Sequence, residues 1–126
     1  MKRKKKINRT TKAYQLRQSR IDRKKALLEW SLNARTAANF CCEVCHQDHH
    51  VQSHHLMPKR FAPALMLDPM NALVLCPKHH ALGLFAFETN AIWASEWLKS
   101  HKPIQWQWVM DRIKEYQYIQ DNWTGQ

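Results

Sequence analysis

Hydrophobic positions recur with a helical period over residues 21–38, which therefore predict a helix. Ile21, Leu28 and Leu32 lie near one face of that helix, and no glycine or proline interrupts the segment. Residues 1–19 are polar and basic and lack such a pattern, so we expect them to be disordered, or helical only on a partner. The chain therefore divides into an arm, residues 1–20, and one folded domain, residues 21–126.

The middle of the chain predicts two short strands followed by a helix. Residues 50–56 are a candidate strand, and the continuous apolar run 72–75 is typical of a buried strand. Prolines mark residues 57–70 as a loop. Pro77 fits the first turn of a helix, where its missing N–H costs nothing, and this helix would reach about Phe87. The core motif spans residues 40–88, and the fold class is α+β.

Residues 92–99 and 104–120 predict two further helices. This C-terminal region is rich in tryptophan. We interpret these rings mainly as a core packed over the middle of the chain, with a stacking surface for nucleotide bases as the alternative. For Trp30, packing is again the favoured role.

Charge is distributed very unevenly along the 126 residues, whose formal net charge is +10. Residues 1–25 contain twelve Lys or Arg and a single acid, Asp22. Such an arm suits a polyanion, most simply nucleic acid, and Lys4, Lys5 and Lys6 are candidate contacts. A solvated tail or a nuclear localisation signal are the alternatives.

Hydropathy gives no sign of a secretory signal or of a membrane span. No apolar run follows the basic start, and no stretch of about 20 apolar residues occurs. We therefore expect a cytoplasmic protein, in which thiols stay reduced. In that setting a Cys-x-x-Cys pair indicates a metal or redox site before a disulfide.

Cys42 and Cys45 form a C-x2-C pair, and Cys76 and His79 form a C-x2-H pair. Together they supply four ligands for a tetrahedral structural zinc. Redox chemistry at the first pair is the alternative, but the βαβ context of a thioredoxin-like site is missing. The neighbouring Cys41 could replace Cys42, although we expect it to be a small buried residue.

Two histidine pairs flank this framework. His54 and His55 lie in the candidate strand, where successive side chains point to opposite faces. His79 and His80 lie in the candidate helix, where neighbours point roughly 100° apart. In each pair one ring can therefore bind a metal while the other serves a second site.

These residues resemble the HNH endonuclease family. The resemblance covers about residues 40–82 and rests on the C-x2-C pair, His54-His55-x-x-Pro58, and Asn71-Ala-Leu-Val-Leu-Cys76-Pro-Lys-His79-His80. It implies a ββα-metal finger, stabilised here by zinc and flanked by N- and C-terminal helices. Residues 93–109 also resemble the tails of small phage-encoded HNH proteins.

The resemblance also implies roles for the remaining residues. His55 would be the general base that activates water, and His54 and His80 would hold one catalytic ion, such as Mg²⁺, Mn²⁺, Ni²⁺ or Zn²⁺. Asn71 would complete the catalytic motif by bracing the loop between the strands. Many family members carry a further metal-binding His beyond the position of His80. Here Glu88 is the candidate for an oxygen ligand.

The sequence thus predicts a metal-dependent endonuclease that hydrolyses DNA, with Lys59 and Arg60 as further candidate phosphate contacts. The alternative is a zinc-containing DNA- or RNA-binding module whose catalytic site has decayed. Such a module would act within a phage packaging or recombination complex.

Overall fold

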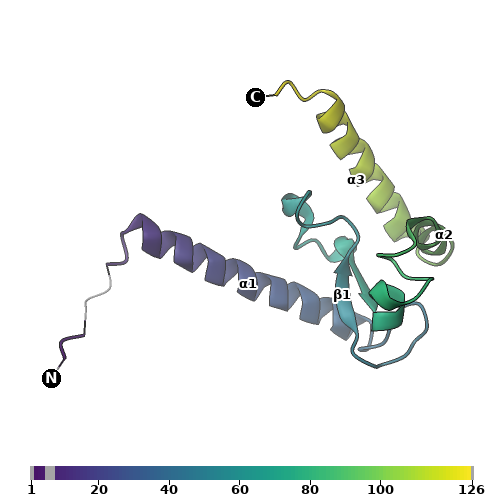
Figure 1. The fold of residues 1–126 in the computed structure, drawn as a ribbon, viewed down its shortest axis with the longest axis horizontal. Helices are drawn as coiled ribbons and strands as arrows, with labels where there is room; N and C mark the ends of the chain where they lie inside the picture. Colours follow the sequence, from purple (N-terminus) through teal and green to yellow (C-terminus); the bar gives the residue numbers. More distant parts are fainter. Residues whose placement is uncertain (1, 5–7, 126) are drawn as a thin grey trace.

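The computed structural model describes residues 2–4 and 8–125 and combines helices with a small two-stranded antiparallel sheet (Figure 1). The fold is therefore α+β, as predicted. Its main elements are α1 (Lys12–Ala37), β1 (Gln52–His55), β2 (Ala72–Leu75), α2 (Ala91–His101) and α3 (Pro103–Asp121). Among the described residues, no helix is both long enough and apolar enough to cross a membrane.

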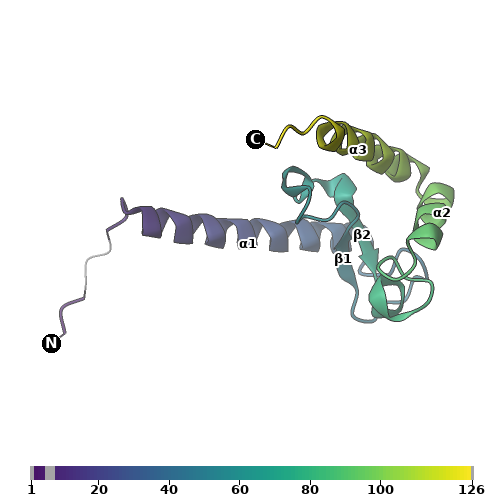
Figure 2. The same cartoon turned by 45° about the horizontal axis from the view of Figure 1, so that its top comes forward.

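Helix α1 begins earlier than the sequence pattern predicted. It starts at Lys12 rather than near Ile21, so the described part of the predicted disordered arm includes helical residues 12–20. The Thr11 side chain caps the helix by accepting the N–H of Tyr14 at 3.2 Å. No glycine or proline follows before Ala37, so the helix continues without a break. Its N-terminal part projects away from the rest of the molecule (Figures 1 and 2).

The two strands hold the centre of the fold. β1 pairs with β2 in antiparallel register, with Gln52 opposite Leu75 and His55 opposite Ala72. All four residues of β2 are buried, which confirms the strand predicted from the apolar run. β1 lies within the predicted range 50–56 but is shorter than that range. The C-terminal part of α1 packs against both strands.

The segment after β2 differs from the helix predicted over residues 77–87. It forms one π-helical turn, Lys78–Leu82, which closes when the Gly83 N–H donates to the Lys78 carbonyl at 3.0 Å. A Cβ at Gly83 would lie 2.7 Å from that carbonyl oxygen, so this close approach requires glycine. The chain then turns back, and the Glu88 N–H donates to the His80 carbonyl at 3.0 Å.

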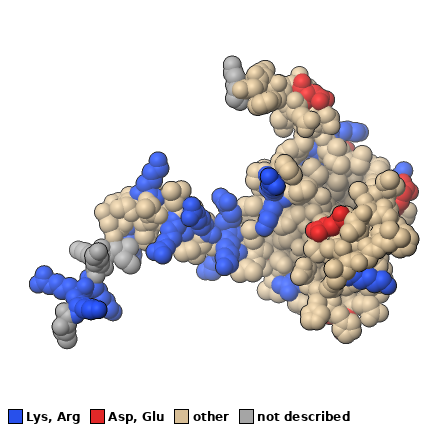
Figure 3. Space-filling model, viewed as in Figure 1, with Lys and Arg blue, Asp and Glu red and all other residues tan. Residues whose placement is uncertain are grey.

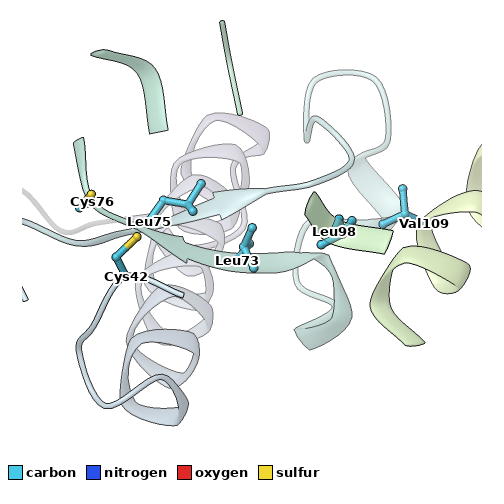
Figure 4. Close-up of a cluster of buried hydrophobic side chains, with 6 residues drawn as sticks. All are labelled: Cys42, Leu73, Leu75, Cys76, Leu98 and Val109. Carbon is cyan, nitrogen blue, oxygen red and sulfur yellow. The ribbon is translucent and has the colours of Figure 1, made fainter. Parts of the chain in front are cut away.

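Helices α2 and α3 pack against each other and extend the core beyond the sheet. Leu98 of α2 and Val109 of α3 lie in one buried cluster with Leu73 and Leu75 of β2 (Figure 4). Three of the C-terminal tryptophans, Trp97, Trp106 and Trp108, pack around this cluster, as the sequence predicted. The other two lie outside it: Trp93 is half-buried beside Phe87, and Trp123 has 71% of its surface exposed.

Glu43 links helices α2 and α3 to the sheet. Its backbone N–H donates to the Val74 carbonyl at 2.9 Å, and its carboxylate accepts the Val74 N–H at 2.8 Å. The same carboxylate pairs with Lys102, at the junction of α2 and α3, at 2.9 Å. The cysteine-containing turn, β2 and the helical hairpin are therefore held together through one side chain.

Candidate functional site

Cys42, Cys45, Cys76 and His79 converge on one point, with all four ligand atoms within 4.8 Å of one another. The sulfurs of Cys45 and Cys76 are 3.7 Å apart, and Cys76 Sγ lies 3.4 Å from His79 Nδ1. Zinc with Zn–S bonds of about 2.3 Å separates two thiolates by about 3.8 Å in a tetrahedral site. This group can therefore hold a metal ion such as zinc with little adjustment. The two buried cysteines, Cys42 and Cys76, lie side by side in Figure 4.

The thiols of Cys42 and Cys45 differ in their electrostatic surroundings. Burial raises the pKa of Cys42, but the N–H groups of Cys45, Cys76 and Val44 outweigh burial and hold that pKa below its ordinary value. Burial and the adjacent thiols raise the pKa of Cys45 to about 11. A divalent ion would offset the repulsion between neighbouring thiolates.

Cys41 lies outside this cluster. It is half-buried, and its thiol donates to the Asn39 carbonyl at 3.3 Å. The expectation that Cys41 would be a buried packing residue was wrong, because the backbone at Asn39 and Phe40 takes a left-handed turn with positive φ. That turn directs Cys42, rather than Cys41, into the interior.

A second group of candidate ligands comprises His54, His80 and Glu88, whose ligand atoms also lie within 4.8 Å of one another. His80 Nε2 is 3.0 Å from a Glu88 carboxylate oxygen. The rings of His54 and His80 meet edge to face, with centroids 5.1 Å apart. Glu88 reaches this group because the chain folds back after the π turn.

His54 is in the protonation state that metal binding requires. Burial, together with the nearby His80, lowers its pKa to about 4. Its imidazole is therefore neutral near pH 7, and a neutral nitrogen can donate a lone pair to an ion.

His55 points to the other side of β1, as the strand period predicted. Its ring stacks on Trp30 of α1, with centroids 3.9 Å apart and planes 9° from parallel. Trp30 is held in turn by a hydrogen bond from its indole N–H to the Asp68 carbonyl at 2.9 Å. This buried ring packs against the site, which is the role favoured from the sequence.

A backbone carbonyl fixes the proton on His55. Nε2 lies 2.9 Å from the carbonyl oxygen of Met66, which can only accept a hydrogen bond. In the neutral ring Nε2 therefore carries the proton and Nδ1 keeps a free lone pair. Burial lowers the pKa of His55, the Met66 contact opposes this shift, and the Lys59 charge adds to it.

Asn71 is fully buried beneath the loop between the strands. Its side chain accepts the Met57 N–H at 2.6 Å and donates to the carbonyls of Met57 and Leu65. Asn71 thus holds both ends of the segment that presents the Met66 carbonyl to His55. These are the contacts of a bracing residue.

An open groove of about 660 Å³ connects the two faces of β1. The groove is lined by the three candidate metal ligands His54, His80 and Glu88. His55 and two exposed cations, Lys59 and Arg60, also line it. The groove therefore brings His54, His55 and His80 together with Lys59 and Arg60, whereas Asn71, also predicted as part of the catalytic motif, does not line it. Lys4 is exposed at the N-terminal end, whereas Lys5 and Lys6 lie outside the described residues.

Sequence reasoning missed the two partners of His55. Trp30 and Met66 are ordinary hydrophobic residues in pattern, and no motif marks either as a neighbour of a histidine.

A comparison with protein-family models, curated proteins and solved structures found no match. The function is therefore inferred from the residues of the groove.

Proposed function

We propose that this protein is a metal-dependent endonuclease that hydrolyses phosphodiester bonds in DNA with a metal site of the HNH type. The observation that carries the proposal is that His54 and His55 point to opposite faces of β1 and have different surroundings. His54 belongs to a group of ligands that can hold an ion, while His55, which lines the same groove, keeps the lone pair of its neutral ring on Nδ1.

In this mechanism His55 is the general base. Its neutral Nδ1 takes a proton from a water molecule, whose oxygen attacks the phosphorus. Stacking on Trp30 and the hydrogen bond to Met66 hold the ring in one orientation, so little reorganisation is needed during proton transfer. Lys59 and Arg60 would bind the phosphates on either side of the scissile bond.

His54, His80 and Glu88 would hold the catalytic ion. A divalent ion there supplies charge stabilisation for the phosphate and for the departing 3′ oxygen. Two imidazoles and one carboxylate suit several transition metals as well as Mg²⁺, so the donor set fits such an ion without selecting one. The closed Cys₃His group leaves no position for water, which favours a structural role for zinc.

The basic N-terminal region would anchor the substrate. Lys and Arg side chains line the projecting part of α1, while the rest of the molecule carries charges of both signs (Figure 3). Contacts from such a helix to phosphates supply affinity that does not depend on base sequence.

The test is cleavage of supercoiled plasmid in separate reactions with Mg²⁺, Mn²⁺, Ni²⁺ and Zn²⁺. His55→Ala should lower the cleavage rate by about 10²–10⁴-fold, because the proton acceptor is removed while the ligands remain. Its affinity for DNA should not change. His54→Ala and Glu88→Gln should also cut slowly, but higher metal concentrations should partly restore their rates.

His49→Ala is the matched control, because His49 lies in the same histidine-rich stretch but is exposed and outside the groove. It should cut like the wild type. If His55→Ala also cuts like the wild type, the assignment of the base is wrong. If the wild type cuts no DNA with any of the four ions, the protein is better described as a zinc-dependent nucleic-acid-binding module within a larger complex.

A further inference from the structure

A second groove, of about 390 Å³, lies between the loop after β1 and the C-terminal end of α3. Its walls are largely apolar and include three aromatic rings, contributed by Phe61 on one side and by Tyr116 and Trp123 on the other. Phe61 and Trp123 are each 71% exposed. Large exposed aromatic rings clustered around one groove indicate a binding surface.

This aromatic groove adjoins the open groove of about 660 Å³ beside β1, which we name the catalytic groove for its proposed role. Pro58 lines both of them. A tight turn follows, in which the N–H groups of Phe61 and Ala62 both donate to the Pro58 carbonyl, at 3.0 and 2.9 Å. The turn directs Lys59 and Arg60 to the catalytic groove and Phe61 to the aromatic groove. The Arg60 guanidinium also lies over the Phe61 ring, 5.3 Å from its centroid.

We propose that the aromatic groove binds the unpaired bases of a DNA strand whose backbone runs past Lys59 and Arg60. This inference rests on the proposed function and gives it a substrate class: DNA with a junction between duplex and single strand. Aromatic side chains stack on any base, and neighbouring cations hold the phosphates, which is the usual combination in single-strand binding. No acidic side chain lines the groove within the described residues.

The position of the groove fits such a junction. The loop that contains Lys59 and Arg60 lies between the projecting α1 and the end of α3 in both ribbon views (Figures 1 and 2). A duplex held on basic α1 would therefore reach the catalytic groove from one side, and an unpaired strand would leave it beneath α3. A second copy of this chain is a poorer occupant, because twofold pairing through this surface would bring the cations of both copies together.

The experiment measures binding by fluorescence anisotropy, using the full chain loaded with one equivalent of zinc and no other divalent ion, and electrophoresis of the probes afterwards checks that they stay uncut. The probes are a labelled single-stranded oligodeoxynucleotide, a blunt duplex and a forked duplex that share one sequence. The wild type should bind the fork more tightly than the blunt duplex. Phe61→Ala and Trp123→Ala should each weaken binding to the fork and to the single strand by at least about fivefold, and should leave the blunt duplex unaffected.

Phe61→Tyr keeps an aromatic ring and should retain fork binding. Tyr118→Ala is the matched control, because Tyr118 is also an exposed aromatic residue of α3 but does not line the groove. It should bind all three probes like the wild type. Hydrolysis of bis(p-nitrophenyl) phosphate by Tyr118→Ala should match that of the wild type, because Tyr118 lies outside both grooves.

Three outcomes would overturn the inference. The wild type could bind fork and blunt duplex with equal affinity, or the Ala variants could lose the same amount of affinity for both probes. Light scattering could also show that the wild type is a dimer and the Ala variants are monomers. The last result would assign the groove to a second copy. A protein that prefers forks yet hydrolyses neither plasmid nor the small diester would refute the nuclease while supporting the groove.

Discussion

His54 and His55 are neighbours in sequence, yet they meet different surroundings because β1 turns alternate side chains to opposite faces. That alternation could be predicted from the strand pattern alone. The Met66 carbonyl that fixes the proton on His55 could not, because it belongs to an irregular loop whose conformation leaves no periodic signal. At the scale of single residues, the sequence thus indicated the candidate site residues but not the neighbours that orient them.

Lys59 gives a prediction about the pH dependence of the reaction. Burial, with the Lys59 charge adding to its effect, lowers the pKa of His55 from its ordinary 6.5. A base must be neutral, so the midpoint of the decline in cleavage rate toward acid pH should lie below 6.5. Lys59→Gln removes a positive charge and should move this decline to higher pH.

The measurement is the rate of bis(p-nitrophenyl) phosphate hydrolysis against pH at saturating divalent ion. Lys99→Gln is the control, because this exposed lysine of α2 lies outside the catalytic groove. Its profile should match that of the wild type. A Lys59→Gln profile that also matches the wild type would mean that Lys59 does not influence the base.

At the scale of elements, apolar runs predicted the strand 72–75 and the C-terminal helices well, because burial imposes a period on the sequence. Two boundaries were wrong. Helix α1 extends into residues 12–20, where a capping residue and uninterrupted helix formers set its start. The helix predicted to reach Phe87 ends at Leu82, since Gly83 allows the chain to approach the Lys78 carbonyl and turn back.

The four candidate zinc ligands link elements that are far apart in the chain, and this gives a stability prediction. Cys76→Ser should abolish zinc binding and cooperative thermal unfolding, because a site of this kind contributes much of the folding free energy of a small domain. Cys41→Ser should retain both, since Cys41 lies outside the cluster. Elemental analysis would measure zinc in both variants, and near-ultraviolet circular dichroism would follow their thermal unfolding. A zinc-free Cys76→Ser protein that unfolds like the wild type would contradict a structural role.

At the scale of the whole molecule, positive charge is concentrated in residues 1–25, half of whose twelve Lys and Arg residues lie in the projecting part of α1. The composition predicted this concentration of charge but not the helix. Arg17, Arg20 and Lys24 are exposed and spaced to share one face of α1. Changing all three to Gln preserves helix propensity while removing their charges. The slope of log K against log salt for DNA binding should flatten by about 0.9 for each phosphate that the variant no longer neutralises.

Filter binding of a blunt duplex over a range of salt concentrations would measure that slope. Lys114→Gln on α3 is the control, because this exposed lysine lies away from both α1 and the catalytic groove. It should leave the slope unchanged. An unchanged slope in the triple variant as well would show that this face of α1 does not bind the duplex.

The π turn carries His79 toward one group of ligands and His80 toward the other, so the two ions would share a single five-residue support. We expect their uptake to follow a compulsory order. Calorimetric titration of Mn²⁺ should show binding to the zinc-containing protein and none after zinc is stripped, whereas equal affinity in both states would show that the sites assemble independently. With such an order, a newly made chain would remain a latent enzyme until it acquired zinc, and zinc supply rather than the catalytic ion would decide when it begins to cut.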